Sequence, residues 1–446
     1  MSSLLRRTGP FAHRNPRLYV LFTLLYNARA YYPVLAIFFT DLGLSLERFV
    51  LLNLVWAAAI FLLEIPSGAL ADTIGRKRLL VISAAIMVVE MGILLVAPKD
   101  GGWLLFALCI VNRALSGASE AAASGADEAI AYDSLPEQDR ESAWDDVLST
   151  AMRWRAAGFL IAMTLGGLLY DPTWLNRGLA HLPGSPGIPL EIAHRLPVAV
   201  VFLQALACLA ITLRLEEPPR ESCDESALAH CRSALRLTLR TARWAFTTRS
   251  IALIIFGALL IDGIIRNFAT INSEYYRLIG LPEWSFGVIG SAIAVLNWFV
   301  PSVARRVNRR TTPLGAIAIA GGLTLLALLA IAPAWPWFGI LPAMFLMGML
   351  GFLGFTVSRS LHALADSSQR ATLLSVKGLA FNLGYGTFSL MFSVAIAKLR
   401  DGESPAAESA AFLSALQWQP LAFLLAMLAF FTLVRLWPVA AVCDRR

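Results

Sequence analysis

Long apolar runs, separated by short polar segments, recur along the whole chain of 446 residues. A helix needs about 20 mainly apolar residues to cross the hydrocarbon core of a bilayer. Twelve segments fit this requirement, near residues 18–40, 48–70, 79–97, 103–132, 146–170, 196–214, 250–279, 285–304, 313–332, 338–364, 372–397 and 417–437. The pattern therefore predicts an all-α polytopic membrane protein with twelve transmembrane helices.

A polar stretch divides these segments into two sets of six. We expect an N-terminal six-helix bundle over 1–214, a cytoplasmic linker over 215–248 and a C-terminal six-helix bundle over 249–446. A weak internal repeat, offset by 233 residues, favours a parallel duplication of six spans. The linker also carries four arginines at helical spacing, which indicates an amphipathic helix against anionic lipid headgroups rather than nucleic acid. These are Arg232, Arg236, Arg240 and Arg243.

Composition and charge agree with a membrane location. The chain is 57% hydrophobic and 15% charged, whereas a soluble domain is about a quarter charged. Lys and Arg concentrate in alternate loops, so the positive-inside rule explains the net charge of +7 and predicts that both termini are cytoplasmic. Only four of the 37 basic residues are lysines, which suggests a GC-rich bacterial genome and hence the bacterial cytoplasmic (inner) membrane. One outer loop, residues 171–194, is rich in Pro and Gly, and we expect it to be irregular.

Several classes of protein are disfavoured by missing motifs. The five cysteines and five histidines form neither a CxxC nor an HExxH pattern, so we expect no metal site and no cofactor. The sequence contains no GxxxxGK[ST] loop, so it does not support ATP-driven transport by this chain alone. A membrane enzyme is disfavoured because no nucleophile–base constellation is visible, although a serine paired with a distant histidine stays open. The expected partners are the lipid bilayer and a small-molecule substrate, with the protein a monomer.

The most specific local motif is GALADTIGRKRLL, residues 68–80, between the second and third predicted spans. It resembles the G-x-L-A-D-x-x-G-R-[KR] loop of the major facilitator superfamily, and more broadly the chain resembles bacterial drug/proton antiporters of that family. The resemblance implies two six-helix bundles around a central cavity that opens alternately to each side. It implies that Asp72 stabilises the outward-facing state, and Asp133 is a candidate partner for the arginines of the loop. The loop residues assigned to this latch are Gly68, Asp72, Gly75, Arg76 and Lys77.

The fourth predicted span carries several charges. Its R-x-x-S-G-x-x-E sequence resembles the family's R-x-x-Q-G motif, with Ser116 in place of glutamine. Arg113, Glu120 and Asp127 are seven residues apart, so on one continuous helix they drift by only about 20° per step and form a polar stripe facing an interior cavity. An intramembrane charge costs at least about 2.5–3.5 kcal/mol, which favours a functional use.

Two interpretations of this stripe stay open. In the first, a carboxylate carries a proton and Arg113 pairs with it in one conformational state. Glu120 is then the better candidate, because Asp127 lies nearer the inner face. In the second, the charges are an interhelical ion-pair cluster that fixes packing and never titrates.

Other predicted spans also contain polar and charged residues. Glu64 and Glu90 are each either a second proton site or an acid that helps helices to pack. Arg29, flanked by aromatic residues, suits a substrate anion or a carboxylate counter-ion. The candidate residues of the substrate cavity are Asn27, Arg29, Tyr31, Tyr32, Asp262, Arg266, Asn267 and Arg359. Within this set Asp262 and Arg266 are four residues apart, the spacing of a pair along one helix.

The leading hypothesis is proton-coupled export of a small amphipathic or anionic molecule, energised by the transmembrane proton gradient. It rests on the charged fourth span and on the intramembrane arginines. The fifth span repeats the spacing of the family's antiporter motif at Gly158, Ala162 and Gly166, but it lacks the central glycine and proline, which weakens the antiport inference. The alternatives are a proton symporter that imports an organic anion and a non-coupled lipid translocator.

Overall fold

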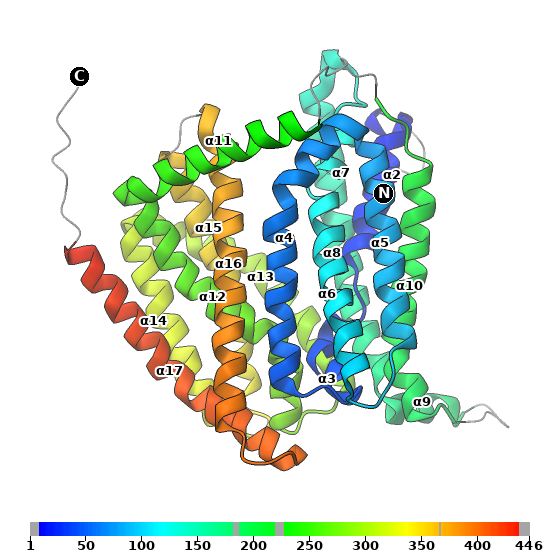
Figure 1. The fold of residues 1–446 in the computed structure, drawn as a ribbon, viewed down its shortest axis with the longest axis vertical. Helices are drawn as coiled ribbons and strands as arrows, with labels where there is room; N and C mark the ends of the chain where they lie inside the picture. The colour runs from blue at the N-terminus through cyan, green and yellow to red at the C-terminus, as the bar shows by residue number, and fades with distance from the viewer. Residues whose placement is uncertain (1–8, 182–186, 219–226, 365–366, 437–446) are drawn as a thin grey trace. The chain divides into compact units, whose positions relative to one another are not determined.

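The computed structural model describes residues 9–181, 187–218, 227–364 and 367–436 (Figure 1). Over these residues the chain forms helices and turns and no β-strand, which confirms the all-α prediction. The elements of the first part of the chain are η1 Gly9–Ala12, α2 Arg14–Asn27, η2 Tyr32–Val34, α3 Leu35–Asp41, α4 Leu46–Ile74, α5 Arg76–Val96, α6 Trp103–Ala123, α7 Ala126–Tyr132, η3 Glu137–Asp139, α8 Arg140–Tyr170, α9 Pro172–Leu179 and α10 Leu190–Leu213. The later elements are α11 Ala227–Thr247, α12 Arg249–Leu278, α13 Trp284–Arg310, α14 Pro313–Ile331, α15 Ile340–Leu364, α16 Ser367–Leu399 and α17 Pro405–Leu436.

The predicted spans correspond closely to these helices. Within the described residues, 11 helical segments are long and apolar enough to cross a membrane, and each overlaps one predicted span. The remaining predicted span, 146–170, coincides with α8, a helix of 31 residues. Its first half carries Asp145, Asp146, Arg153 and Arg155, so its apolar part is confined to the second half.

The first predicted span is not one continuous helix. The chain leaves the helical conformation between α2 and η2, at Ala28–Tyr31, and becomes α-helical again at α3. Pro33 supplies no backbone N–H and disfavours the α conformation in the residue before it. Helix α8 packs directly against this break, because a Cβ at Gly166 would overlap the carbonyl oxygen of Ala30. Only glycine permits this approach of two backbones.

The fourth predicted span is also broken. Helix α6 ends at Ala123 and the separate helix α7 begins at Ala126, because Gly125 adopts a left-handed conformation with φ of 73°. A residue with a Cβ rarely takes this conformation, and it interrupts an α-helix. The prediction of one stripe from Arg113 to Asp127 on a continuous helix is therefore wrong, because Asp127 belongs to α7 and follows the interruption at Ser124 and Gly125.

The chain divides into two compact units. The first comprises residues 1–237 together with 270–296, and the second comprises 238–269 and 297–446. Helices α11, α12 and α13 thus contribute residues to both units. The predicted domain boundaries at 214 and 249 stay predictions.

Each unit is built from helices packed side by side. In the first unit α6 packs against α4 and α5, α10 packs against α5, and α2 packs against α8 (Figure 1). A cluster of buried side chains near the start of α2 joins it to α7 and α8: Phe11, Tyr19, Val20, Ala131, Val147 and Ala151. In the second unit α14 packs against α15 and α17, and α16 packs against α17.

Two connecting segments can be compared with their predictions. The basic helix expected in the linker corresponds to α11, a 21-residue helix on which all four arginines are exposed, while its cytoplasmic location stays a prediction. The prediction of an irregular loop over 171–194 is wrong for part of that range, since it contains α9 and the start of α10. Asp171 explains the first of these helices, because its carboxylate accepts the backbone N–H of Thr173 at 2.8 Å and caps α9.

The contact between α8 and the break in the first span gives a stability prediction. We expect Gly166→Ala to lower the free energy of unfolding by about 1–3 kcal/mol, because the new methyl group forces two backbones apart. Unfolding of the detergent-solubilised protein would measure it. Gly178→Ala in α9, where nothing lies within 4 Å of the added Cβ, is the matched control. Equal stability of the two variants would contradict the close approach.

Candidate functional site

A buried ion pair lies at the break in the first predicted span. Nη1 of Arg29 is 2.7 Å from Oε1 of Glu90 on α5, and the two side chains are 4% and 0% exposed. Arg29 also lies over the ring of Tyr26, 5.4 Å from its centroid. Opposite charges removed from water are tolerated when they are paired in good geometry. The structure therefore joins two residues that the sequence left separate, and Glu90 is the carboxylate counter-ion anticipated for Arg29.

Hydrogen bonds surround this pair with further buried polar groups. Asn112 of α6 donates to the backbone carbonyl of Glu90 at 2.8 Å. The hydroxyl groups of Tyr26 and Ser119 lie 2.8 Å apart, and Ser83 donates to the carbonyl of Ser119 at 2.8 Å. This network connects α2, α5 and α6 within the first unit.

Arg113 differs from Arg29 in its surroundings. It is 6% exposed, and its Nε is buried without a hydrogen-bond partner. Among the described residues no hydrogen bond or ion pair to Arg113 is present, and Oε2 of Glu90 likewise lacks a hydrogen bond. A guanidinium group carries five N–H donors in a rigid planar arrangement that matches carboxylate or phosphate. Arg113 therefore retains the capacity to bind an anionic acceptor.

The predicted proton carriers occupy different environments. Glu120 is exposed and Glu64 is partly exposed, and the two carboxylates interact electrostatically across α4 and α6. The hydroxyl of Ser67 on α4 donates to the carbonyl of Ala121 at 2.7 Å and fixes the two helices to each other there. Asp127 lies in the first turn of α7, where its carboxylate accepts the backbone N–H of Glu128 at 2.8 Å. A carboxylate at this position is stabilised by the helix dipole.

The second unit contains its own polar group on α12 and α16. Nη2 of Arg266 is 2.8 Å from Asp262, so the pair that their spacing suggested is present. Arg266 also donates to Asn382 of α16 at 2.9 Å. Asn267 is buried and accepts a hydrogen bond from Ser389 at 3.2 Å. The guanidinium group of Arg266 therefore has both a carboxylate and an amide acceptor within the second unit.

The other cavity candidates have local roles in the structure. Arg359 is exposed and donates to the carbonyl of Asn308, near the carboxyl end of α13, at 2.7 Å. Asn27 donates to the carbonyl of Thr23 at 2.7 Å. Tyr31 is buried beside Arg29, whereas Tyr32 is 37% exposed. Their assignment to a substrate cavity stays a prediction.

Two acidic residues, Asp133 and Glu217, contact the start of α5 in the loop motif of residues 68–80. Gly75 separates α4 from α5, and the next residue, Arg76, forms an ion pair with Asp133. The backbone N–H groups of Arg76 and Lys77 donate to the carboxylate of Glu217 at 2.9 and 2.8 Å. Glu217 thus satisfies unpaired N–H groups at the start of α5.

Two further residues of the predicted latch are Asp72 and Gly68. The side chain of Asp72 lies outside the described residues, and nothing lies within 4 Å of a Cβ added at Gly68. The sequence analysis missed Glu217. Glu216 and Glu217 directly follow the sixth predicted span, on the side of the membrane where the basic loop is predicted to lie. This position was the signal available in the sequence.

No group of three or more His, Cys, Asp or Glu side chains within the described residues could hold a metal ion. What the described residues do contain is paired and unpaired charge inside apolar helices. Charge of this kind inside apolar helices is typical of a functional site in a helical membrane protein.

A family model described as "Major Facilitator Superfamily" matches residues 18–389. The chain belongs to this family, whose members are generally carriers rather than enzymes. No significant match to a curated protein was found.

Solved structures share the fold over nearly the whole chain. The nucleoside transporter NupG superposes with a TM-score of 0.68 at 13% identity, covering 95% of this chain and 98% of its own. A bacterial homologue of the human lysosomal transporter Spinster, inward-facing and unoccupied, also gives 0.68, at 17% identity, with 93% and 95% covered. A D-xylose–proton symporter gives 0.59 at 14% identity, with 90% and 96% covered. At these identities the similarity shows the fold alone, and it confirms the twelve-helix fold class.

The buried pair gives a second stability prediction. We expect Glu90→Ala to lower the free energy of unfolding by about 3–5 kcal/mol, because it leaves the Arg29 cation buried and unpaired. The double variant Arg29→Met/Glu90→Leu removes both charges, so it is expected to recover most of this loss. Denaturant titration of the purified protein would measure both.

The control for this experiment is an exposed pair. Arg14 and Glu216 lie 2.7 Å apart with 47% and 65% of their side chains exposed, so Glu216→Gln is expected to cost no more than about 1 kcal/mol. A double variant as unstable as Glu90→Ala would contradict the buried-charge explanation.

Proposed function

We propose that this carrier is a proton-coupled secondary transporter that exports a small amphipathic or anionic molecule by alternating access. The observation that carries the substrate part of this proposal is Arg113, a buried guanidinium group without a described protein acceptor. Two other intramembrane arginines each form an ion pair with a carboxylate. Arg29 pairs with Glu90, and Arg266 pairs with Asp262. A carboxylate or phosphate group of the substrate can form charge-assisted hydrogen bonds with the guanidinium group of Arg113.

The proton part rests on Glu64 and Glu120. These two carboxylates come from facing helices of the first unit and interact electrostatically. A proton bound by one of the two carboxylates removes the repulsion between their charges. Glu120 follows Arg113 by seven residues on α6, so proton and substrate binding would occur on the same helix and can influence each other.

The second candidate is proton symport that imports an organic anion. It is supported by a neighbour described as a D-xylose–proton symporter. The same charged residues serve either direction. Export is preferred because of the charged fourth span, the intramembrane arginines and the partial antiporter motif of the fifth span.

The distribution of Lys and Arg along the chain favours a particular membrane location and orientation. We place the protein in the cytoplasmic membrane of a bacterium, with both termini in the cytoplasm, as a monomer without a cofactor. The exposed arginines of α11 support this orientation, because they suit the anionic cytoplasmic leaflet.

Ligand binding tests the role of Arg113. A panel of aromatic and aliphatic carboxylates, each paired with its neutral amide, would be screened for thermal stabilisation of the purified protein. We expect the best carboxylate to bind at least about tenfold more tightly than its amide, a difference of about 1.4 kcal/mol. Arg113→Gln is expected to abolish this preference, whereas Arg310→Gln, which changes an exposed arginine at the end of α13, is expected to retain it. A wild-type protein that prefers the amides would contradict the anionic substrate.

Transport in proteoliposomes tests the role of Glu120. With the carboxylate selected above, an imposed pH gradient is expected to drive accumulation by the wild type. Glu120→Gln is expected to bind the ligand and to exchange it without response to the gradient, since the variant carries no titratable proton there. Glu128→Gln, at an exposed position in α7, is the matched control. Transport that is independent of the gradient in the wild type would contradict proton coupling, and uptake against efflux in oriented vesicles would decide the direction.

A further inference from the structure

Asn53 of α4 is a buried polar side chain whose hydrogen-bonding groups are unused. It is 0% exposed, and neither its Oδ1 nor its Nδ2 has a hydrogen-bond partner among the described residues. The side-chain amides of three other buried asparagines, Asn15, Asn112 and Asn308, are all hydrogen-bonded. A buried amide without partners destabilises a protein and is rare in native structures. Asn53 therefore points to a partner outside the described chain.

Helices α4 and α6 pack side by side and run in the same direction. A Cβ added at Gly43, shortly before α4, would lie 2.7 Å from the backbone N of Gly101, shortly before α6. Near the start of α4, Cζ of Arg48 lies 5.6 Å from the ring centroid of Phe106, near the start of α6. Both helices therefore begin at the same end of the first unit.

The face of α4 that carries Asn53 is the one that packs against α6. Asn53, Ile60 and Ser67 are seven residues apart, so they follow one side of the helix with a drift of about 20° per step. A Cβ at Gly117 of α6 would lie 3.3 Å from the backbone N of Ile60. Ser67 donates to the carbonyl of Ala121 at 2.7 Å. Asn53 therefore faces α6, nearer to the start of both helices than these two contacts.

Arg113 lies at about the same depth as Asn53. It precedes Gly117 by one turn on the same side of α6, and Asn53 precedes the part of α4 that touches Gly117 by a little over one turn. Glu90 of α5 is level with them, because its backbone carbonyl accepts a hydrogen bond from the residue before Arg113 at 2.8 Å. Nε of Arg113 and Oε2 of Glu90 are also buried without hydrogen-bond partners. Three helices thus carry unused polar atoms at one depth.

These unused atoms are of two kinds. Nε–H of Arg113 and Nδ2 of Asn53 are donors, which an anionic oxygen can satisfy. Oδ1 of Asn53 and Oε2 of Glu90 are acceptors, which an anionic oxygen cannot satisfy. A ligand that satisfies both kinds brings a hydrogen-bond donor beside its negative charge. A hydroxyl group fits this role better than an ammonium group, whose positive charge Arg113 would repel.

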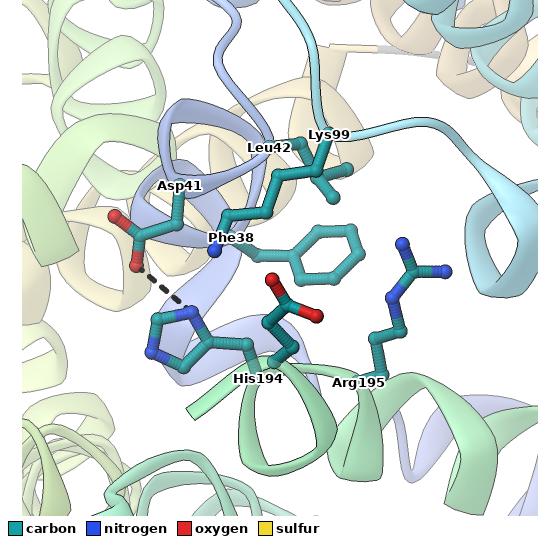
Figure 2. A pocket seen from close by; sticks show the side chains of 7 residues that line it. Phe38, Asp41, Leu42, Lys99, His194 and Arg195 are labelled. Atoms are coloured by element: carbon teal, nitrogen blue, oxygen red, sulfur yellow. Dashed lines mark ion pairs between the residues drawn. The ribbon is translucent and has the colours of Figure 1, made fainter. Parts of the chain in front are cut away.

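The small cavity at the end of the unit where α4 and α6 begin does not offer such a site. Its volume is about 60 Å³ (Figure 2), whereas sites for organic ligands measure about 300–1,000 Å³. On its wall, Asp41 is paired with Arg277 at 2.8 Å, accepts the hydroxyl of Tyr170 at 2.6 Å and lies 3.5 Å from His194. The cavity is therefore large enough for water but too small for a transported molecule.

We propose that Asn53 belongs to the substrate site of the first unit, and that the transported anion carries a hydroxyl group beside its carboxylate or phosphate. This inference rests on the proposed function, which assigns the anion to Arg113. The anionic group accepts from Nε of Arg113 and Nδ2 of Asn53, and the hydroxyl donates to Oδ1 of Asn53. No covalent bond forms or breaks.

The closed state of the site agrees with a carrier. Asn53 and Arg113 are 0% and 6% exposed, so the substrate reaches them only when this part of α4 moves, as alternating access requires. Because the amide of Asn53 makes no hydrogen bond in the closed arrangement, opening the site breaks none there.

Paired ligands test the hydroxyl group. Binding of lactate and propionate, and of mandelate and phenylacetate, to the purified wild type would be measured by calorimetry. Each hydroxy acid is expected to bind at least about tenfold more tightly than its partner, because the partner leaves Oδ1 of Asn53 unpaired. Equal binding within both pairs, or no binding by any of the four acids, overturns the proposal. The comparison of carboxylates with amides described above reports separately on the proposed function.

Two variants identify the acceptor of the hydroxyl group. Asn53→Leu, which replaces the amide by an apolar group of similar size, is expected to reduce the hydroxyl preference to less than about twofold. The preference for carboxylates over amides remains, since Arg113 is unchanged. Asn308→Leu is the matched control, because Asn308 is a buried asparagine of the second unit that donates to Thr356 at 2.9 Å. It is expected to keep the hydroxyl preference. A full preference in Asn53→Leu overturns the proposal.

The unfolding temperatures of the same variants provide a measurement that needs no ligand. Asn53→Leu is expected to unfold about 1–2 °C above the wild type, because it removes a buried amide without partners, and Asn308→Leu is expected to unfold below it. A structural role for Asn53, such as holding a buried water between α4 and α6, has the opposite consequence. A lower unfolding temperature for Asn53→Leu therefore assigns that role and overturns the proposal.

Discussion

The cost of an unpaired charge inside a bilayer is the constraint on which most of the first unit depends. Arg29 and Glu90 are almost completely removed from solvent and meet at 2.7 Å, a separation at which a low-dielectric environment makes mutual attraction large and the loss of either partner severe. Asn112 holds the backbone of Glu90, and Tyr26 covers Arg29 with its ring. The small hydroxyl residues of α5 and α6 then complete a polar centre that would be unstable in any one helix alone.

Polar groups of the backbone, like charged side chains, must be paired or covered by protein at membrane depth. Non-helical segments at membrane depth are tolerated where protein covers them, and the break at Ala28–Tyr31 is covered by α8 at Gly166. The break also places Arg29 outside a regular helix, so that its side chain can reach α5. The left-handed Gly125 interrupts the helix further along the chain, and Asp133, which follows the last residue of α7, forms an ion pair with Arg76 of the loop.

Periodicity and hydropathy predicted what depends on local sequence. They located most spans within a few residues, although α17 begins at Pro405 rather than near 417, and the four-residue spacing of Asp262 and Arg266 anticipated their pair. They could not join Arg29 to Glu90, which are 61 residues apart, or place Glu217 on the N–H groups of Arg76 and Lys77 across the fold. The stripe through Asp127 failed because a single glycine conformation outweighed a regular seven-residue spacing. Asp41, Tyr170, His194 and Arg277 were missed for the same reason as the buried pair, since each stands at the end of a different helix and only the fold brings them together.

Exposure separates the ion pairs that can exchange during a transport cycle from those that cannot. Arg29 and Glu90 are buried, so separating them would strand two charges, and the pair acts as a fixed joint between the first span and α5. Arg76 and Asp133 are 22% and 39% exposed, and Arg277 and Asp41 are 34% and 21% exposed. These groups are partly accessible to water, so separating them strands less charge than separating Arg29 from Glu90. Alternating access needs contacts that hold in one state and release in another without a large barrier. The partly exposed clusters near Arg76 and Asp41 meet that requirement, whereas the buried centre between them preserves the geometry on which Arg113 depends.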